Sequence, residues 1–150
     1  MPIATDGSVD PEKLRRFEEQ PHPFYTLIGA RIVSLSRDRV EAELRITPAL
    51  SNRSGIAHGG AVVAVADHLG GAATIINLPP GARTATIESK TNFLASIPTG
   101  DTVRAVCTPL HRGRTTMVWE IRILRSDGRL AAVVTQTQIV IPAGARAGSD

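Results

Sequence analysis

The sequence predicts an α+β protein, in which an antiparallel sheet of about six strands wraps around one long central helix. Six segments are typical of strands, most clearly residues 39–47, where apolar and mainly charged side chains alternate with a period of two. Between the second and third of these segments lies a stretch, residues 57–78, that is apolar on nearly every side. A helix of that composition has to be surrounded by other elements.

The elements follow in a simple order along the chain. A short N-terminal helix should begin near Asp10, because Asp is a good N-cap and Pro11 suits the first helical position. It should end near Glu19, before Pro21. The six expected strands cover residues 30–36, 39–47, 84–94, 101–110, 115–125 and 130–141. Turn residues separate them, and Ser126-Asp-Gly128 is a strong hairpin signal.

Length and composition indicate one globular domain over residues 10–142, with a loose N-terminus over residues 1–9 and a loose tail over residues 143–150. The 150 residues are 42% hydrophobic and 21% charged. A net charge of +3 suits an anionic small ligand, but the basic residues are too scattered for nucleic acid.

The one cysteine, Cys107, excludes an internal disulfide. The N-terminus lacks the pattern of a signal peptide, so a cytoplasmic location is expected.

The long apolar stretch favours a homodimer. It is about long enough for a membrane span, but it contains Asp67, His68 and four glycines, which favours a buried helix. One sheet covers only one side of such a helix. A second subunit is the natural cover for the other side, so burial alone predicts a dimer.

Two positions on this helix carry residues that could take part in catalysis. His58-Gly59-Gly60 stands at its start, where the first backbone N–H groups have no intrahelical partner and the dipole is positive. Such N–H groups can polarise a carbonyl oxygen, although two glycines can also simply loosen a junction. Asp67 stands among apolar residues, where a carboxylate costs desolvation free energy unless it is paired or functional. A purely structural, hydrogen-bonded Asp is the alternative.

The spacing of these residues along the helix determines whether one subunit can place them at the same substrate. His58 lies about 13 Å and Gly59 about 12 Å from Asp67 along a helix. Neither can share one carbonyl carbon with Asp67 of the same subunit. If both act on one substrate, Asp67 must come from the antiparallel helix of a partner. This argument and the burial argument lead to the same dimer.

The pattern Asn52-x5-His58-Gly59-Gly60-x6-Asp67 resembles that of hotdog-fold acyl-CoA thioesterases. The closest likeness is to the branch of the phenylacetic-acid-pathway thioesterases and thioesterase superfamily member 2, and the segment 86–101 resembles their third strand. The resemblance runs over residues 25–141. It implies a hotdog fold and hydrolysis of a thioester to a carboxylic acid and free coenzyme A, with no metal or redox cofactor.

The resemblance also implies roles for individual residues. Asp67 would be the nucleophile or general base, and the Gly59 N–H would polarise the carbonyl. Asn52 would help to hold the Asp or the water, and His58 would support the loop. Thr86 stands where the family has a water-positioning Ser, so a hydroxyl is retained. Asp67 and Thr86 of one chain would face Asn52, His58 and Gly59 of the other.

Residues that bind the rest of the substrate are less sharply marked. The coenzyme A phosphates would lie at the surface near basic side chains, each of which could equally be a solvated charge. The candidate substrate-binding residues are Gly60, Arg53, Arg83, Lys90, Arg112 and Arg114. His22 and His111 have no partner at metal-ligand spacing, and His68 points about 100° away from Asp67, as a packing or interface residue would.

Two other functions stay open at this point. A hotdog hydratase or dehydratase would use His58 and Asp67 as an acid/base pair across two chains. A non-catalytic acyl-CoA-binding protein would need no Asp67. The acyl group and the choice between a dimer and a dimer of dimers do not follow from the sequence.

Overall fold

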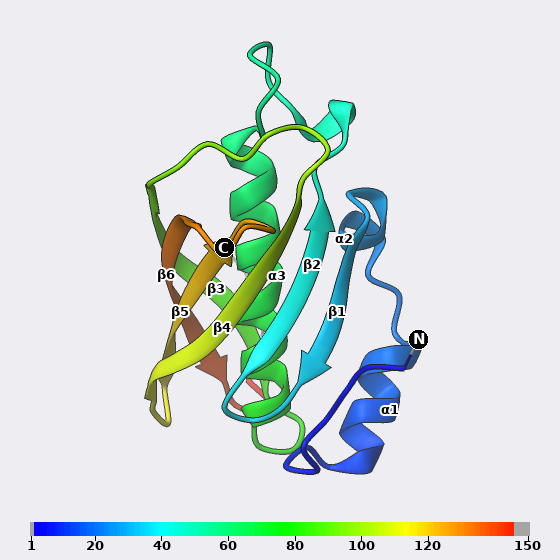
Figure 1. The fold of residues 1–150 in the computed structure, drawn as a ribbon. Helices are drawn as coiled ribbons and strands as arrows, with labels where there is room; N and C mark the ends of the chain where they lie inside the picture. The colour runs from blue at the N-terminus through cyan, green and yellow to red at the C-terminus, as the bar shows by residue number, and fades with distance from the viewer. Residues whose placement is uncertain (1, 146–150) are drawn as a thin grey trace.

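The computed structural model describes residues 2–145. Six antiparallel strands form one sheet in the order β1-β2-β4-β5-β6-β3, and the sheet curves around the long helix α3 (Figure 1). The elements are α1 (Pro11–Glu19), α2 (Pro23–Leu27), β1 (Ala30–Leu35), β2 (Val40–Arg45), the 3-10 turn η1 (Pro48–Leu50), α3 (Gly59–Asn77), β3 (Arg83–Phe93), β4 (Thr102–Arg112), β5 (Thr116–Leu124) and β6 (Leu130–Ile141). The predicted α+β architecture is confirmed, and it is the hotdog arrangement that the resemblance implied.

The N-terminal region is more ordered than expected. Helix α1 begins as predicted, with the Asp10 carboxylate accepting the N–H groups of Glu12 and Lys13 at 2.9 and 3.1 Å. The segment before it, expected to be loose, is attached to the fold instead, because Ala4 pairs with the edge of β1. The sequence pattern does not predict helix α2, because prolines after α1 indicate only the end of that helix, whereas Pro23 also suits the first position of a new one.

Only the first residues of the C-terminal tail, 143–145, are described by the structure. Ala145 closes a turn on Pro142, and its carbonyl oxygen accepts a hydrogen bond from Arg83 at 3.0 Å. Residues 143–145 of the tail expected to be loose therefore contact the fold. Residues 146–150 lie outside the described residues.

Helix α3 is buried on one side and open on the other. Its inner side packs on the sheet, where Trp119, Ile121 and Leu69 are fully buried. A stripe at helical spacing is less covered: Asp67 and Ile75 are exposed, and Ala64 and Gly71 are half-buried. The helix also has the length and hydropathy of a membrane span, but 56% of that window is buried within the protein. Its place against the sheet is that of a core helix.

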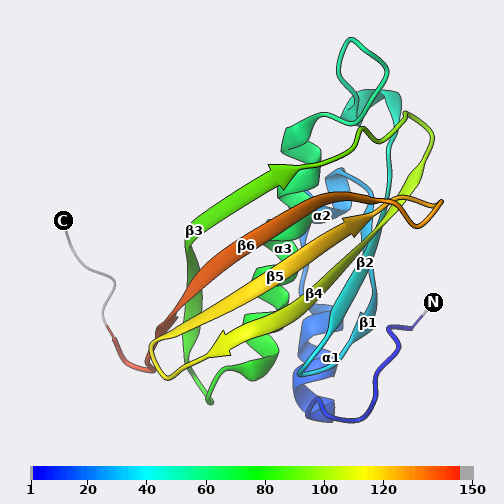
Figure 2. The same cartoon turned by 60° about the vertical axis from the view of Figure 1, so that its left-hand side comes forward.

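Strand β3 forms one edge of the sheet, beside the open side of α3 (Figure 2). Among residues 2–145 it pairs only with β6, so its other edge offers backbone groups that no strand of the described chain pairs with. Ile87 and Phe93 on this strand are 57% and 58% exposed. A long edge strand with exposed apolar side chains is typical of a surface that pairs with another chain.

Candidate active site

The loop-to-helix junction has the geometry that an oxyanion site requires. His58 is the N-cap of α3, and its Nδ1 accepts the Gly60 N–H at 2.9 Å. The Ala61 N–H donates to the His58 carbonyl oxygen at 3.0 Å. Within residues 2–145, the Gly59 N–H has no protein acceptor. Gly59 therefore offers the free donor at the positive end of the helix, whereas the N–H of Gly60, a candidate for substrate binding, is already used.

An apolar cavity of about 400 Å³ opens beside this free N–H. Its walls come from the junction itself, the end of β3 with the loop that follows, and the start of β6. They are formed by Ile56, Ala57, Gly59, Val62, Phe93, Leu94, Ala95, Ser96, Ile97, Ala131 and Ala132. The Phe93 ring closes the junction so tightly that a Cβ on Gly59 would lie 3.1 Å from its Cζ. No charged side chain lines the cavity, which suits an apolar group.

Asp67 projects from the open stripe of α3 and is anchored by hydrogen bonds on one side only. Its Oδ1 accepts from Thr86 Oγ1 at 2.9 Å and from Gln136 Nε2 at 2.7 Å. Its Oδ2 has no protein donor among residues 2–145. The expectation of a carboxylate enclosed by apolar neighbours is wrong for the single chain, where Asp67 is exposed. Thr86 and Asp67, which the resemblance placed together, do lie together.

Two glutamines of this network were missed by the sequence reading. Gln136 and Gln138 of β6 are 0% and 1% exposed. Gln138 Nε2 donates to Thr86 Oγ1 at 2.8 Å, and its Oε1 accepts from Thr84 at 3.0 Å. A signal was present, because both glutamines occur in phase with the buried Val134 on a strand that alternates. Polar residues on a buried face have to be hydrogen-bonded, which points to a network.

The remaining site residues lie away from Asp67 within one chain. Asn52 belongs to a small hairpin, residues 51–57, that projects beyond the N-terminal end of α3 (Figure 1). Its Oδ1 accepts the Ser54 N–H at 2.9 Å, as in an Asx turn. Because α3 is continuous from Gly59 onwards, Gly59 and Asp67 are separated by about 12 Å along the helix axis. One chain thus carries two separate groups of site residues.

His68 packs inside the protein, as expected of a packing residue. Its ring stacks on Tyr25 at 3.7 Å between centroids and meets His22 edge-on at 5.0 Å. Burial, with a smaller contribution from His22, lowers the pKa of His68 to about 4, although Asp67 acts in the opposite direction. His68 is therefore a neutral packing residue at neutral pH.

This burial predicts a pH-dependent stability. The unfolded imidazole takes up a proton near pH 6.5 and the folded one only near pH 4, so protons favour the unfolded chain between these values. The free energy of unfolding should be undiminished above about pH 6.5 and decrease as the pH falls toward 4. Denaturant titrations at pH 7 and 5 measure this change. His68→Phe should flatten it, the exposed His111→Gln serves as control, and an equal slope in His68→Phe would contradict the assignment.

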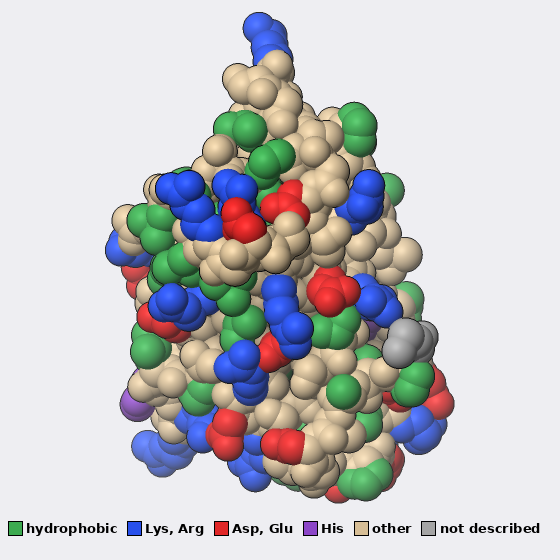
Figure 3. Space-filling model, viewed as in Figure 1, with side chains coloured by type: hydrophobic (Ala, Val, Ile, Leu, Met, Phe, Trp, Pro, Cys, Tyr) green, Lys and Arg blue, Asp and Glu red, His purple; other side chains and the backbone are tan. Residues whose placement is uncertain are grey.

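The five basic candidates do not form one site. Basic and acidic side chains alternate over the face drawn in Figure 3. Arg83 bonds the Ala145 carbonyl, Lys90 bonds Asn92 at 2.6 Å, and Arg53 stands in the projecting hairpin. The structure brings only Arg112 and Arg114 to one cavity.

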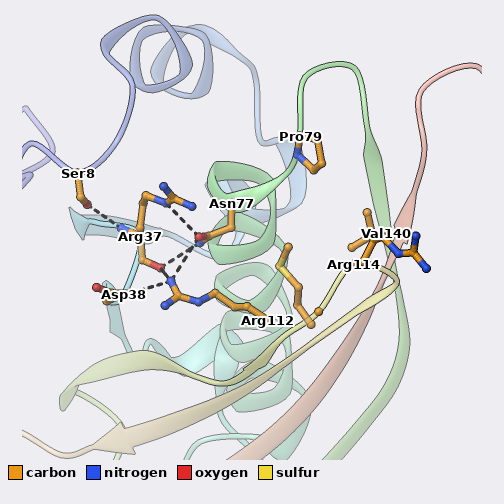
Figure 4. A pocket seen from close by; sticks show the side chains of 10 residues that line it. Ser8, Arg37, Asp38, Asn77, Pro79, Arg112, Arg114 and Val140 are labelled. Carbon is orange, nitrogen blue, oxygen red and sulfur yellow. Dashed lines mark hydrogen bonds and ion pairs between the residues drawn. The ribbon is translucent and has the colours of Figure 1, made fainter.

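That cavity, of about 590 Å³, lies at the C-terminal end of α3 and adds a third arginine, Arg37 (Figure 4). Arg112 Nη1 pairs with Asp38 at 2.7 Å and donates to the Arg37 carbonyl oxygen at 2.9 Å. Arg114 has no ion pair within the part of the chain that the structure describes. Three guanidinium groups against one carboxylate leave the cavity cationic. Residues 2–145 contain no cluster of three or more His, Cys, Asp or Glu arranged to hold a metal.

Comparison with known proteins gives a consistent result. The family model of the thioesterase superfamily matches residues 54–132. The chain is 30% identical to the 1,4-dihydroxy-2-naphthoyl-CoA hydrolase of Escherichia coli, over 76% of this chain and 83% of that protein. It is 32% identical to the proofreading thioesterase EntH of Cronobacter turicensis, over 68% and 74%. The crystal structure of thioesterase HI1161 from Haemophilus influenzae superimposes with a TM-score of 0.81 at 26% identity, covering 93% of this chain and 95% of that one.

Proposed function

The chain belongs to the thioesterase superfamily and is a thioester hydrolase, and we propose that it cleaves acyl-coenzyme A at a site shared by two subunits. The observation that carries this proposal is the pairing of complementary features. One end of α3 offers a free N–H beside an apolar cavity, and the middle of α3 offers a carboxylate with a free oxygen. Each feature supplies what the other lacks for hydrolysis.

The proposed reaction uses these two groups and a water molecule, without a metal or redox cofactor. The thioester oxygen accepts the Gly59 N–H, which stabilises the negative charge as the carbonyl carbon becomes tetrahedral. Oδ2 of Asp67 takes a proton from water, and the hydroxide adds to the carbon. The C–S bond then breaks and the thiolate leaves as coenzyme A, taking up that proton. Direct attack by Asp67, through an anhydride that water opens, gives the same products.

A dimer that buries the open side of α3 would bring the two groups together. The less covered stripe of Ala64, Gly71 and Ile75 flanks Asp67 and is small or apolar, which permits close approach of a second helix. The edge strand β3 lies beside Asp67, which accepts a hydrogen bond from Thr86 of that strand. Both surfaces are suited to an isologous partner, whose Gly59 and projecting Asn52 hairpin would reach Asp67.

The two cavities are proposed to hold the two ends of the substrate. The apolar cavity beside Gly59 would take the acyl group, which then lies next to its own carbonyl. The cationic cavity of Arg37, Arg112 and Arg114 would take the phosphates of coenzyme A. It begins near Asn77, about 15 Å along the helix from Asp67. The proposal keeps the cytoplasmic location expected from the sequence, which an unpaired, buried Cys107 suits.

Thiol release from a panel of acyl-CoA substrates tests the proposed function. The panel should contain short, medium and long aliphatic acyl groups, phenylacetyl-CoA and 1,4-dihydroxy-2-naphthoyl-CoA. We expect release of one thiol per turnover, with apolar acyl groups preferred over the dihydroxylated one, because the cavity offers few hydrogen-bond partners. Hydration of crotonyl-CoA without thiol release, or tight binding of acyl-CoA without turnover, would contradict the proposal.

A further inference from the structure

The hydrogen bonds around Thr86 leave its hydroxyl group no freedom. Gln136 Nε2 and Gln138 Nε2 lie 3.0 and 2.8 Å from Thr86 Oγ1, and an amide nitrogen can only donate. They occupy the two lone pairs of the hydroxyl oxygen. Its single hydrogen then points to Asp67 Oδ1 at 2.9 Å, the one acceptor that it contacts among residues 2–145. Every donor and acceptor of this hydroxyl is in use, so none is left for a water molecule.

The neighbours of the two amides place a nitrogen of each against Thr86. Gln138 Oε1 lies 3.0 Å from the Thr84 hydroxyl, which also lies 2.9 Å from the Ile139 carbonyl oxygen, and Gln138 Nε2 faces Thr86. Gln136 Nε2 faces three acceptors, of which Asp67 Oδ1 at 2.7 Å and Thr86 Oγ1 at 3.0 Å are nearer than the Asp67 carbonyl oxygen at 3.3 Å. Reversing the Gln136 amide would place its oxygen against the carboxylate. The donors therefore converge on one oxygen of Asp67.

Packing keeps this arrangement rigid. Gln136 is fully buried under α3, where a Cβ on Gly70 would lie 2.9 Å from its Cδ. Glycine at this position is what lets the glutamine reach Asp67. Within the described part of the chain, Gln136 Oε1 is buried without a hydrogen-bond partner, which costs free energy that the contacts of Nε2 offset. A β-bulge at Ile87, directly after Thr86, is the kind of distortion that re-aims side chains beside active sites.

We infer that Thr86 and Gln136 are positioning residues, which hold Asp67 by its Oδ1 atom and leave Oδ2 as the reacting oxygen. This inference rests on the proposed function and changes the role that the resemblance implied for Thr86. The hydroxyl orients the carboxylate instead of the water. Gln138 extends the network and donates to the Thr86 hydroxyl oxygen, so that the hydroxyl hydrogen is directed to Asp67.

Kinetics of Thr86→Val and Gln136→Met test the inference. Each removes donors to Oδ1 at nearly constant side-chain volume, so kcat should fall about 10- to 100-fold with KM nearly unchanged. Thr86→Ser keeps the hydroxyl group and should retain most of the activity. Thr137→Val, on β6 outside the network, is the matched control and should behave as the unsubstituted enzyme.

Three outcomes would overturn the inference. Thr86→Val and Gln136→Met could both leave kcat unchanged, or Thr86→Val could lower kcat while Gln136→Met leaves it unchanged, as loss of a water ligand would. The third is a double variant whose loss equals the product of the two single losses, since residues that hold one carboxylate should not act independently. These outcomes are distinct from a failure of the proposed function, which would appear as thiol release unaffected by Asp67→Asn.

Discussion

Asp67→Asn is expected to lower kcat for thioester hydrolysis by about a thousandfold, with KM changed little. The substitution removes the anion that takes a proton from water or attacks the carbonyl carbon. It keeps an oxygen that can still accept from Thr86 and Gln136, so the network around the side chain should persist. Steady-state thiol release measures the loss, and binding of a non-hydrolysable thioether analogue measures whether the substrate still binds.

The result depends on the fold being unchanged. Thermal unfolding and the oligomeric state of Asp67→Asn should match those of the unsubstituted enzyme, because Asp67 is exposed in the single chain and contributes no core packing. A variant that keeps within about tenfold of full turnover would show that Asp67 is a structural residue. The proposed mechanism would then be wrong.

Gly59→Pro should lower kcat about 100- to 1000-fold, the loss typical of one oxyanion donor. Gly59 is the first residue of α3, a position where proline is favoured in helices, and His58 before it has the extended backbone that proline requires, with ψ of 134°. The substitution therefore removes one N–H group and leaves the helix intact. The comparison isolates the backbone donor, which side-chain substitutions cannot do.

Gly59→Ala is the matched control for this variant. Its Cβ meets the Phe93 ring at 3.1 Å, as the proline ring would, but it keeps the N–H group. Phe93 is exposed and can shift, so Gly59→Ala should keep most of the activity. Equal losses in Gly59→Ala and Gly59→Pro would attribute the effect to the Phe93 contact and exclude the N–H as oxyanion donor.

Local patterns were enough to predict most of the fold. Asp10 and Pro11 predicted the start of α1, and the six strands lie within a few residues of the segments expected from their alternation. The order of strands could not be obtained in this way. Nothing in β3 itself shows that it pairs with β6 at an edge, because pairing depends on contacts between residues far apart in sequence.

The candidate site was predicted where a short motif contains it and missed where distant strands meet. His58 and Gly59 are recognisable because a helix start needs particular backbone chemistry. Gln136 and Gln138 lie about seventy residues after Asp67, and only the register of β3 and β6 brings them to it. Their positions in phase with Val134 on an alternating strand were the one sequence feature that indicated their burial. The exposure of Asp67 was unpredictable for a related reason, since the open side of α3 depends on how the sheet curves.

Complementation between Asp67→Asn and Gly59→Pro subunits tests the shared site most directly. The two inactive chains, with different affinity tags, would be co-expressed and the mixed dimer purified through both tags. A mixed dimer has one site with Gly59 from one chain and Asp67 from the other, both intact, and a second site with neither. We expect it to recover about half the thiol release of the unsubstituted dimer. A mixed dimer as inactive as its parents would show that Gly59 and Asp67 do not act on one substrate across the interface.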